Sequence, residues 1–220
     1  MAGFTGFQKE FFEFMVKLRF NNNAEYFNTV RGEYEEFVKA PLYALCDAME
    51  PFIHGVDARL ETRPVRCVSR IRRDTRFTKD KSPYRTNMWI GWSERSVEKA
   101  AAFGFYFDIS DDGYRYGAGF YGEPRAFMEK LRPMLLQTPA MFITAHKAAE
   151  DAGFKLQGEE YKRMALPEGL DLEVERFYKK KGFWYQQEGN VRDLMTAALK
   201  DELEAGFKAL VPLYNIISVS

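Results

Sequence analysis

Cysteine and histidine are scarce in this chain, and this limits the chemistry that it can carry. The 220 residues include two cysteines, Cys46 and Cys67, and two histidines, His54 and His146. Neither cysteine belongs to a CxxC pair, and the four residues lack the grouping of a usual zinc site. We therefore expect two buried free thiols and no metal site. We interpret both histidines as structural or solvent-exposed, and no pattern of residues indicates a cofactor.

Long apolar runs and a net charge are also absent. No segment approaches the roughly 18 apolar residues of a membrane-spanning helix, and the first residues lack the basic start and apolar run of a secretory signal. We therefore expect a cytoplasmic protein that does not enter a membrane. The 32 basic and 32 acidic residues give a formal net charge of zero. Any contact with nucleic acid would therefore depend on a local basic patch.

Aromatic residues, in contrast, are abundant. They make up 16% of the chain, with 20 phenylalanines and 12 tyrosines, which predicts a core built from rings, several of them on strands. A length of 220 residues suffices for one well-filled domain, and no internal repeat or linker divides the chain. We therefore predict a single domain over residues 1–220.

The first part of the chain has helical periodicity. Apolar residues recur at three- and four-residue spacing: Phe4, Phe7, Phe11, Phe14 or Met15, and Leu18. Asn23 is a good N-cap for a second helix that starts near Ala24. Pro41 is expected to bend or restart this helix, which then continues to about residue 53.

Short strands are expected in the middle of the chain, at residues 56–60, 65–71 and 86–92. Alternating phenylalanines then predict one strand of a hairpin over residues 103–109. The turn is Asp111-Asp112-Gly113, in which Gly113 can take a positive φ, and the returning strand runs to residue 120.

Helices are predicted again in the last part of the chain, over residues 124–137, 138–151, 172–179 and 191–210. Gly153 is expected to end the second of these helices, and Asn190 to cap the last one. Strands are predicted at residues 154–157 and 183–187. Because the strands cluster centrally and do not alternate with helices, the predicted fold class is α+β, a mainly antiparallel sheet flanked by N- and C-terminal helices.

The most informative stretch is basic. Residues 59–85 hold ten basic and three acidic residues, a local balance of +7, whereas the remainder holds 22 basic and 29 acidic residues, a balance of −7. Within it, residues 70–85 show neither helical nor strand periodicity and are predicted to form a loop. Arginine binds phosphate and carboxylate through two parallel hydrogen bonds, so this loop is a candidate anion site. The candidate ligand-binding residues are Arg70, Arg73, Asp74, Arg76, Lys79, Asp80, Lys81, Tyr84 and Arg85.

Four interpretations of this loop stay open. Our best functional hypothesis is a small ligand bearing phosphate or carboxylate, with Asp74 and Asp80 orienting the arginines. The loop can instead be a structural ion-pair network, in a non-enzymatic protein that acts through a protein partner of unknown kind. Nucleic acid is a less favoured partner, which would use the arginines with Tyr84, Trp89 and Trp92. A phosphate-ester enzyme would use Asp74 or Asp80, but the sequence assigns no catalytic residue.

Two further motifs are interpreted as structural. The run Gly117-Ala118-Gly119-Phe120-Tyr121-Gly122 lacks the lysine of a P-loop and the spacing of GxGxxG. Its glycines therefore indicate a bulge or close packing beside a large ring. The run Lys179-Lys180-Lys181 is interpreted as a solvated face.

Residues 70–85 read RIRRDTRFTKDKSPYR. They resemble RI-x-RDtRF-x-kDK-x-PYK, the signature of the domain of unknown function 2461 family, with Arg85 where lysine is usual. Further similarity lies in the Phe-rich first helix, in Gly117-x-Gly119-x-Tyr121 with Arg132, and in residues 166–169 and 181–183. The resemblance implies one domain over almost the whole chain. The family's biochemical function is uncharacterised, so the resemblance implies no substrate.

Overall fold

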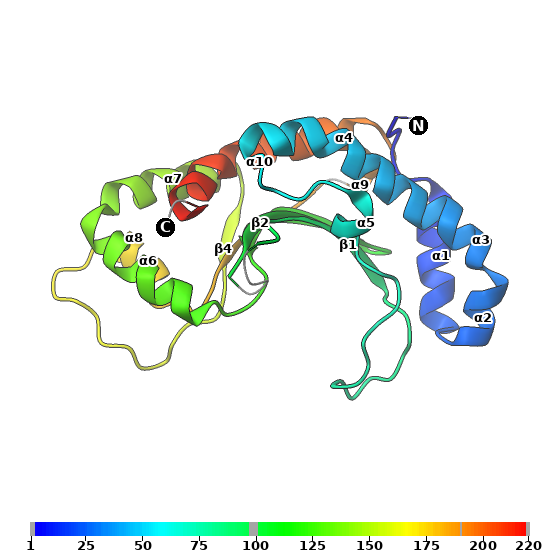
Figure 1. The fold of residues 1–220 in the computed structure, drawn as a ribbon, viewed down its shortest axis with the longest axis horizontal. Coiled ribbons are helices and arrows are strands. Elements are labelled where there is room, and N and C mark those ends of the chain that lie inside the picture. The colour runs from blue at the N-terminus through cyan, green and yellow to red at the C-terminus, as the bar shows by residue number, and fades with distance from the viewer. Residues whose placement is uncertain (1–2, 97–100, 190, 219–220) are drawn as a thin grey trace. The chain divides into compact units, whose positions relative to one another are not determined.

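The computed structural model describes residues 3–96, 101–189 and 191–218 (Figure 1). The chain divides into two compact units. Unit 1 comprises the described residues up to 92 together with 106–116 and 188–204, and unit 2 comprises the described residues of 93–105, 117–187 and 205–218.

An antiparallel sheet carries strands of both units. Its order in the described residues is β1-β2-β3-β5-β4, and its strands are β1 (Asn87–Trp92), β2 (Phe103–Ser110), β3 (Gly113–Phe120), β4 (Lys155–Gln157) and β5 (Trp184–Glu188). Strands β2 and β3 form the predicted hairpin, and Gly113 in its turn has a φ of +145°, a conformation that favours glycine. With helices before and after the strands, the α+β class is confirmed.

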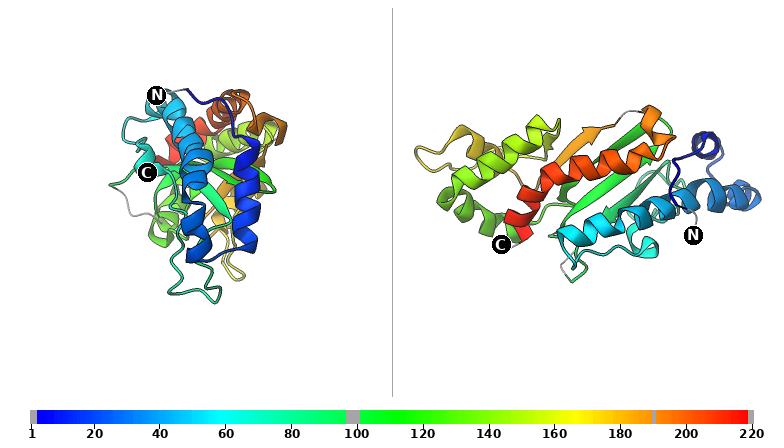
Figure 2. Two further views of the ribbon diagram at one scale, coloured as in Figure 1. Left: turned by 90° about the vertical axis from the view of Figure 1, so that its right-hand side faces the viewer. Right: turned by 90° about the horizontal axis from the view of Figure 1, so that it is seen from above.

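Unit 1 begins with helices, as predicted, but the first one starts at Lys9, so Phe4 and Phe7 lie before it and the predicted start is wrong. The helices are α1 (Lys9–Phe20), α2 (Ala24–Thr29), α3 (Arg31–Glu33), the π-helix η1 (Tyr34–Lys39) and α4 (Ala40–Val56). Asn23 caps α2 as predicted, because its side-chain oxygen accepts a hydrogen bond from the Tyr26 N–H at 2.9 Å. In Figure 2 (left), α1 and the helix through η1 and α4 run side by side.

Pro41 changes the helix without breaking it. The chain widens into η1 directly before α4, and the Ala40 N–H bonds to the Glu35 carbonyl five residues back. Proline lacks an N–H and clashes with the carbonyl four residues before it, which a π-turn accommodates by shifting the hydrogen-bond register. The helix therefore continues through Pro41 to Val56.

The strands predicted at 56–60 and 65–71 are wrong. Helix α4 extends to Val56, and α5 (Pro64–Cys67) occupies the second range, with Pro64 at its first position, where a missing N–H costs no helical bond. Pairing in this region is by isolated bridges, among them Val68↔Ile90, Arg72↔Tyr84 and one at Leu60.

Rings fill the core of unit 1, as the composition predicts. Phe7 stacks on Phe107 of β2 with ring centroids 6.0 Å apart and contacts Phe11 of α1 at 5.1 Å.

Both cysteines are buried and free, as predicted. Their thiols donate to the carbonyls of Thr62 and Glu61. The Cys67 thiol and burial raise the pKa of the Cys46 thiol.

Unit 2 contains α6 (Arg125–Gln137), α7 (Pro139–Asp151), α8 (Leu172–Tyr178), β4 and most of β5. Gly153 has a φ of +91° just after α7, as expected of a helix end. Register in the β4–β5 pair places Lys155 opposite Gln186. Phe183 lies at the centre of the ring core, with Phe120 and Phe177 each 5.4 Å away.

The glycine run is structural, as interpreted. A methyl group added to Gly117 would overlap the Tyr185 carbonyl, and one added to Gly119 would overlap the backbone and Cβ of Trp184. The glycines therefore permit close approach of β5 to β3, although what they approach is backbone rather than a large ring.

The predicted helix 191–210 is two helices, α9 (Val191–Leu194) and α10 (Ala198–Ser218). The Thr196 hydroxyl accepts from the Ala198 N–H at 3.2 Å and so starts the second helix. The N-terminal segment meets this break, where the Phe7 N–H donates to the Leu194 carbonyl at 2.7 Å. The expected cap, Asn190, lies outside the described residues.

In the described part of the chain, no helix combines the length and apolarity needed to cross a membrane.

Candidate functional site

Residues 70–85 form a projecting loop that we call the basic arm. It leaves unit 1 between α5 and β1 (Figure 1). Its two sides pair at the root, where the Arg73 N–H donates to the Pro83 carbonyl at 2.8 Å and the Arg85 N–H donates to the Ile71 carbonyl at 2.9 Å. Beyond Arg73 the described secondary structure is irregular, as predicted, so the arm is a short ribbon that ends in an open loop.

Tyr84 anchors the arm to the helices of unit 1. Its ring is 4% exposed and stacks on Phe27 of α2 with centroids 4.2 Å apart. The Asn22 side chain accepts a hydrogen bond from the Tyr84 N–H at 2.9 Å and donates one to the Tyr84 carbonyl at 3.0 Å. Tyr84, a predicted ligand-binding residue, is therefore part of the core.

Both acidic residues of the arm are paired with its own arginines. The Arg76 guanidinium donates to Asp74 at 2.6 Å, and Arg73 donates to Asp80. These hydrogen bonds lower the pKa of the Asp74 carboxyl to about 2 and hold the pKa of Asp80 well below its ordinary value. Both carboxylates thus stay ionised at neutral pH and orient arginines, which is the ordering role predicted for them.

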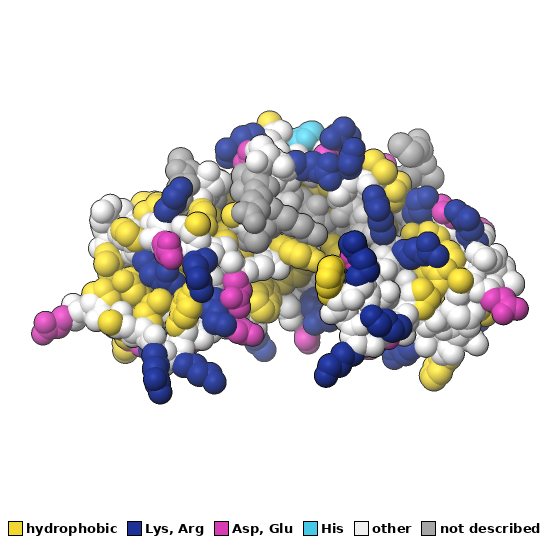
Figure 3. All heavy atoms as spheres, turned by 60° about the horizontal axis from the view of Figure 1, so that its bottom comes forward, with side chains coloured by type: hydrophobic (Ala, Val, Ile, Leu, Met, Phe, Trp, Pro, Cys, Tyr) yellow, Lys and Arg dark blue, Asp and Glu magenta, His cyan; other side chains and the backbone are white. Residues whose placement is uncertain are grey.

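Other cations of the arm have no such partner. The side chains of Arg70, Arg72 and Lys79 are exposed and make no hydrogen bond or ion pair with any described residue. Among the described residues, the Lys81 ammonium has one partner, the backbone carbonyl of Thr75, to which it donates at 2.8 Å. With seven basic and two acidic residues, 7 − 2, the arm carries +5. Lys and Arg side chains, drawn in dark blue, are exposed at the surface shown in Figure 3.

Arg85 lies at the root of the arm rather than with these cations. Its Nε donates to the Arg70 carbonyl at 3.2 Å, and its guanidinium lies 4.5 Å from the centroid of the Trp89 ring on β1. A cation over an aromatic face is attracted by the ring quadrupole. The structure thus brings all nine predicted residues into one arm, with Tyr84 inward and Arg85 against Trp89.

The rings around the arm differ from those that the sequence singled out. Trp92 is 0% exposed and Tyr84 is buried, so neither can stack on a ligand. Trp89 is half-buried. The large exposed rings of unit 1 are instead Phe77, 90% exposed at the end of the arm, and Phe20, 80% exposed at the end of α1.

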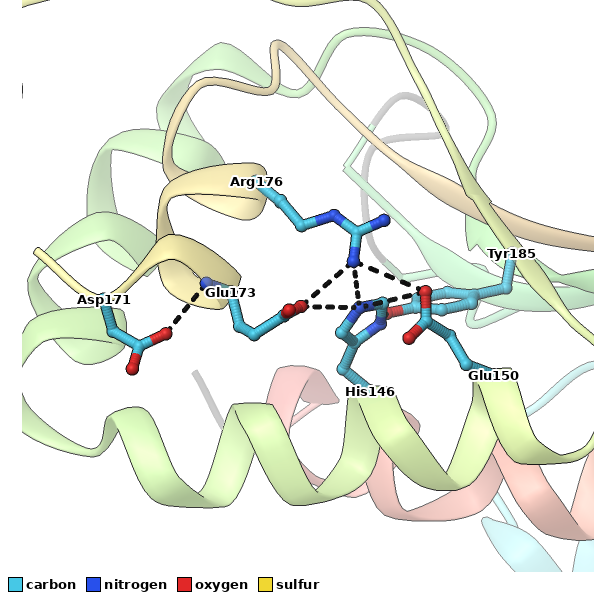
Figure 4. A network of polar contacts seen from close by, with 6 residues as sticks. All are labelled: His146, Glu150, Asp171, Glu173, Arg176 and Tyr185. Carbon is cyan, nitrogen blue, oxygen red and sulfur yellow. Dashed lines mark hydrogen bonds and ion pairs between the residues drawn. The ribbon is translucent and has the colours of Figure 1, made fainter.

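A second polar cluster, which the sequence reading missed, surrounds His146 in unit 2 (Figure 4). His146 lies on α7 and is fully buried. Its Nδ1 is 2.7 Å from the Tyr185 hydroxyl of β5. Its Nε2 lies 3.4 Å from a carboxylate oxygen of each of Glu150 and Glu173, and 3.2 Å from the Arg176 guanidinium.

This cluster connects α7, α8 and β5. The Arg176 guanidinium can only donate, so its 3.2 Å contact makes Nε2 the acceptor, and Nδ1 then carries the proton and donates to the Tyr185 hydroxyl. Burial lowers the pKa of His146, and Arg176 adds to this, whereas Glu150 and Glu173 oppose it. The neutral imidazole is therefore the favoured form. The spacing of His146 and Glu150, one helical turn apart, was the available signal in the sequence.

Neither cluster forms a metal centre. The described residues contain no group of three or more His, Cys, Asp or Glu side chains that could hold a metal ion. At His146 the Arg176 guanidinium also lies between the two glutamates, bonding Glu173 at 3.0 Å and Glu150 at 3.4 Å. A fixed cation at that place neutralises carboxylates that a metal ion would need.

Two cations of unit 2, Lys180 and Arg132, bond backbone carbonyls and so stabilise the fold. Lys180 is buried, 8% exposed, and bonds the Gly158 carbonyl and Glu160, each at 2.9 Å. Residues 179–181 were predicted to form a solvated face, and this prediction is wrong for Lys180, whose side chain is buried. Its charge is tolerated there because a carbonyl and a carboxylate bond it. Arg132 donates to the carbonyls of Tyr178 and Lys180 at 3.0 and 3.1 Å, and so satisfies the end of α8.

These features define an α+β protein with an antiparallel sheet and a projecting basic arm. The chain belongs to the domain of unknown function 2461 family, described as a conserved hypothetical protein, whose sequence model matches residues 10–215. The match includes the entire arm and confirms the resemblance found in it. A comparison with curated proteins found no match.

Proposed function

We propose that the protein binds an anionic ligand, bearing phosphate or carboxylate groups, at the basic arm. One observation carries the proposal. The two aspartates of the arm are already satisfied by Arg73 and Arg76, and Arg70, Arg72 and Lys79 are left exposed without a carboxylate partner among the described residues. Exposed arginine and lysine side chains without a carboxylate partner are free to bind phosphate or carboxylate groups of a ligand.

The geometry of the arm supports this role in a second way. Asp74 and Asp80 hold Arg76 and Arg73 in place through hydrogen bonds, and the Asp80 side chain also accepts from the Ser82 N–H at 2.9 Å. A loop ordered before its ligand arrives loses less conformational entropy on binding. The proposal includes no reaction, because the arginines lower the pKa of both carboxyl groups and so make them weak proton acceptors at neutral pH.

The alternative is that the arm is a structural network and the protein acts through a protein partner. The internal pairs Arg73–Asp80 and Arg76–Asp74 favour it. The exposure of both aspartates opposes it, because exposed ion pairs contribute little to stability. We further propose a cytoplasmic location, which the two free thiols support.

The test is a thermal-shift titration at low salt with inorganic phosphate, tripolyphosphate and citrate. We expect a rise in melting temperature for the wild type and its loss in the double variant Arg70→Ala/Arg72→Ala. The matched control is Arg63→Ala, which removes an exposed arginine that pairs with Glu61 and should leave the rise unchanged. A flat response of the wild type to all three anions, together with an equally flat titration by calorimetry, would contradict the proposal.

A further inference from the structure

We infer that the anion recognised by the basic arm is a single-stranded nucleic acid. The inference rests on the proposed function and names the class of ligand. It is drawn from the shape of the arm, from exposed rings beside it and from the cations placed on those rings.

The shape of the arm suits a long ligand. Residues 76–81 are all exposed, and the buried residues of the arm, Ile71 and Tyr84, serve its root. A small ligand usually lies in a concave site that covers most of its surface. An exposed cationic ribbon, in contrast, gains affinity by following a polyanion over several charges.

Three rings of unit 1 lie in the arm or on segments that contact it. Phe77 is 90% exposed within the arm itself. Phe20 is 80% exposed and is two residues from Asn22, whose side chain bonds the arm at Tyr84. Trp89 is half-buried on β1, directly after the root of the arm. The exposed rings of Phe77 and Phe20 each offer a face on which any base can stack without a sequence preference, whereas the Arg85 guanidinium lies over one face of Trp89.

Cations accompany two of these rings. The Arg76 guanidinium lies 5.5 Å from the centroid of Phe77, and that of Arg85 lies 4.5 Å from the centroid of Trp89. A nucleotide presents a flat base and a phosphate a few ångströms apart. Asp74 holds the Arg76 guanidinium beside Phe77, so the arm presents a ring and a cation together. A nucleotide can contact both, whereas inorganic phosphate or a carboxylate metabolite has no base to stack on the ring.

A lipid surface fits these observations less well. Within the described residues, Phe77 is the one large apolar side chain that the arm exposes, and two aspartates accompany it. Peripheral attachment to a bilayer requires an apolar surface of several side chains or a lipid anchor beside the charges. Even with Phe20 nearby, two exposed rings among charges suit base stacking better.

The test is fluorescence anisotropy with labelled single strands of about 12 thymidine or uridine nucleotides, a length within the usual range of such sites. We expect binding that Phe77→Leu weakens by about tenfold, because leucine keeps the apolar surface but loses the stacking face. Phe20→Leu should weaken binding in the same sense. Tyr121→Leu is the control, since it removes a ring that is 65% exposed in unit 2 and should change nothing.

Salt dependence supplies a second measurement. If Arg70, Arg72 and Lys79 each neutralise one phosphate, the slope of log affinity against log salt is about −2 for a single strand. The variant Arg70→Ala/Arg72→Ala should reduce the magnitude of this slope by more than half, whereas Phe77→Leu should lower affinity and leave the slope unchanged.

Tripolyphosphate and anionic vesicles of phosphatidylserine and phosphatidylcholine separate this inference from the proposed function. Binding of tripolyphosphate without binding of the oligonucleotides would overturn the inference and leave the proposed function standing. Oligonucleotide binding that Phe77→Leu and Phe20→Leu do not weaken would overturn it too, as would binding to vesicles alone. Failure of every anion to bind would overturn both.

Discussion

Asn22 holds the backbone of Tyr84 at both of its polar groups, accepting from the N–H at 2.9 Å and donating to the carbonyl at 3.0 Å. The two residues are 62 positions apart in sequence. One side chain in the turn between α1 and α2 therefore substitutes for a neighbouring strand at the root of the basic arm. This contact fixes the root of the arm against the turn between α1 and α2.

Replacing Asn22 should loosen the arm. Asn22→Ala leaves the N–H and carbonyl of Tyr84 without this partner in a part-buried place, which should lower the free energy of unfolding by about 1–3 kcal/mol. Urea denaturation measures the loss, and hydrogen exchange should become faster at the Tyr84 amide.

The neighbouring Asn21→Ala is the matched control, because the exposed Asn21 side chain donates only to the Lys17 carbonyl in the last turn of α1. It should leave the exchange at Tyr84 unchanged. Equal effects of the two substitutions would show that the Asn22–Tyr84 contact does not hold the arm.

A double-mutant cycle decides whether the pairs inside the arm are structural. Both partners of Arg73–Asp80 are removed singly and together, as Arg73→Ala, Asp80→Ala and the double variant. Because the Asp80 side chain is 59% exposed, we expect a coupling that urea denaturation barely resolves. A large coupling would favour the structural network over the anion site.

Stability should depend on pH through His146. The imidazole titrates near 6.5 in the unfolded chain, and burial lowers its pKa in the folded protein. Between these two values the unfolded chain binds more protons, so the free energy of unfolding rises with pH across this window and levels off above it. His146→Gln should remove this part of the rise, as measured by urea denaturation at several pH values.

Charged groups from α7 and α8 modify this effect, since Glu150, Glu173 and Arg176 all face Nε2. His54→Gln is the control, because His54 is not buried and its loss leaves the His146 cluster intact. An unchanged pH profile in His146→Gln would exclude this explanation.

The glycines of β3 should not tolerate a side chain. Gly117→Ala would force its methyl group into the Tyr185 carbonyl, and we expect a loss of about 1–3 kcal/mol or failure to fold. Gly91→Ala in β1 is the control, because a methyl group added there would point into open space among the described residues. Thermal melting of both variants measures the difference, and equal melting temperatures would contradict close packing of β5 on β3.

Local patterns allowed much of the fold to be predicted. Asn23 before a polar-apolar helix, alternating phenylalanines and a turn that ends in Gly113 each specify a local conformation, and each prediction is confirmed. The wrong strand predictions at residues 56–60 and 65–71 concern segments in which tertiary packing, rather than local sequence, determines whether a strand or a helix forms. Short apolar runs have no periodicity that distinguishes a strand from a helix end, and Pro64 starts a helix there.

The sequence was enough to predict which residues form the candidate site, but not how their side chains pair. The charge of residues 70–85 identified the arm, whereas which cations pair depends on the path of the loop, which joins Arg73 to Asp80 rather than to the adjacent Asp74. His146 was missed because its partners Tyr185 and Arg176 come from other elements. That the chain forms one domain, and that the arm binds a ligand, stay predictions.

Nuclear magnetic resonance titration of the backbone amides with tripolyphosphate at low salt tests anion binding by the arm most directly. We predict saturable shifts concentrated on the amides of residues 70–85, absent from Arg70→Ala/Arg72→Ala and retained in Arg63→Ala. Saturable shifts confined to other parts of the chain, or no shifts at millimolar concentrations, would contradict an anion site at the basic arm.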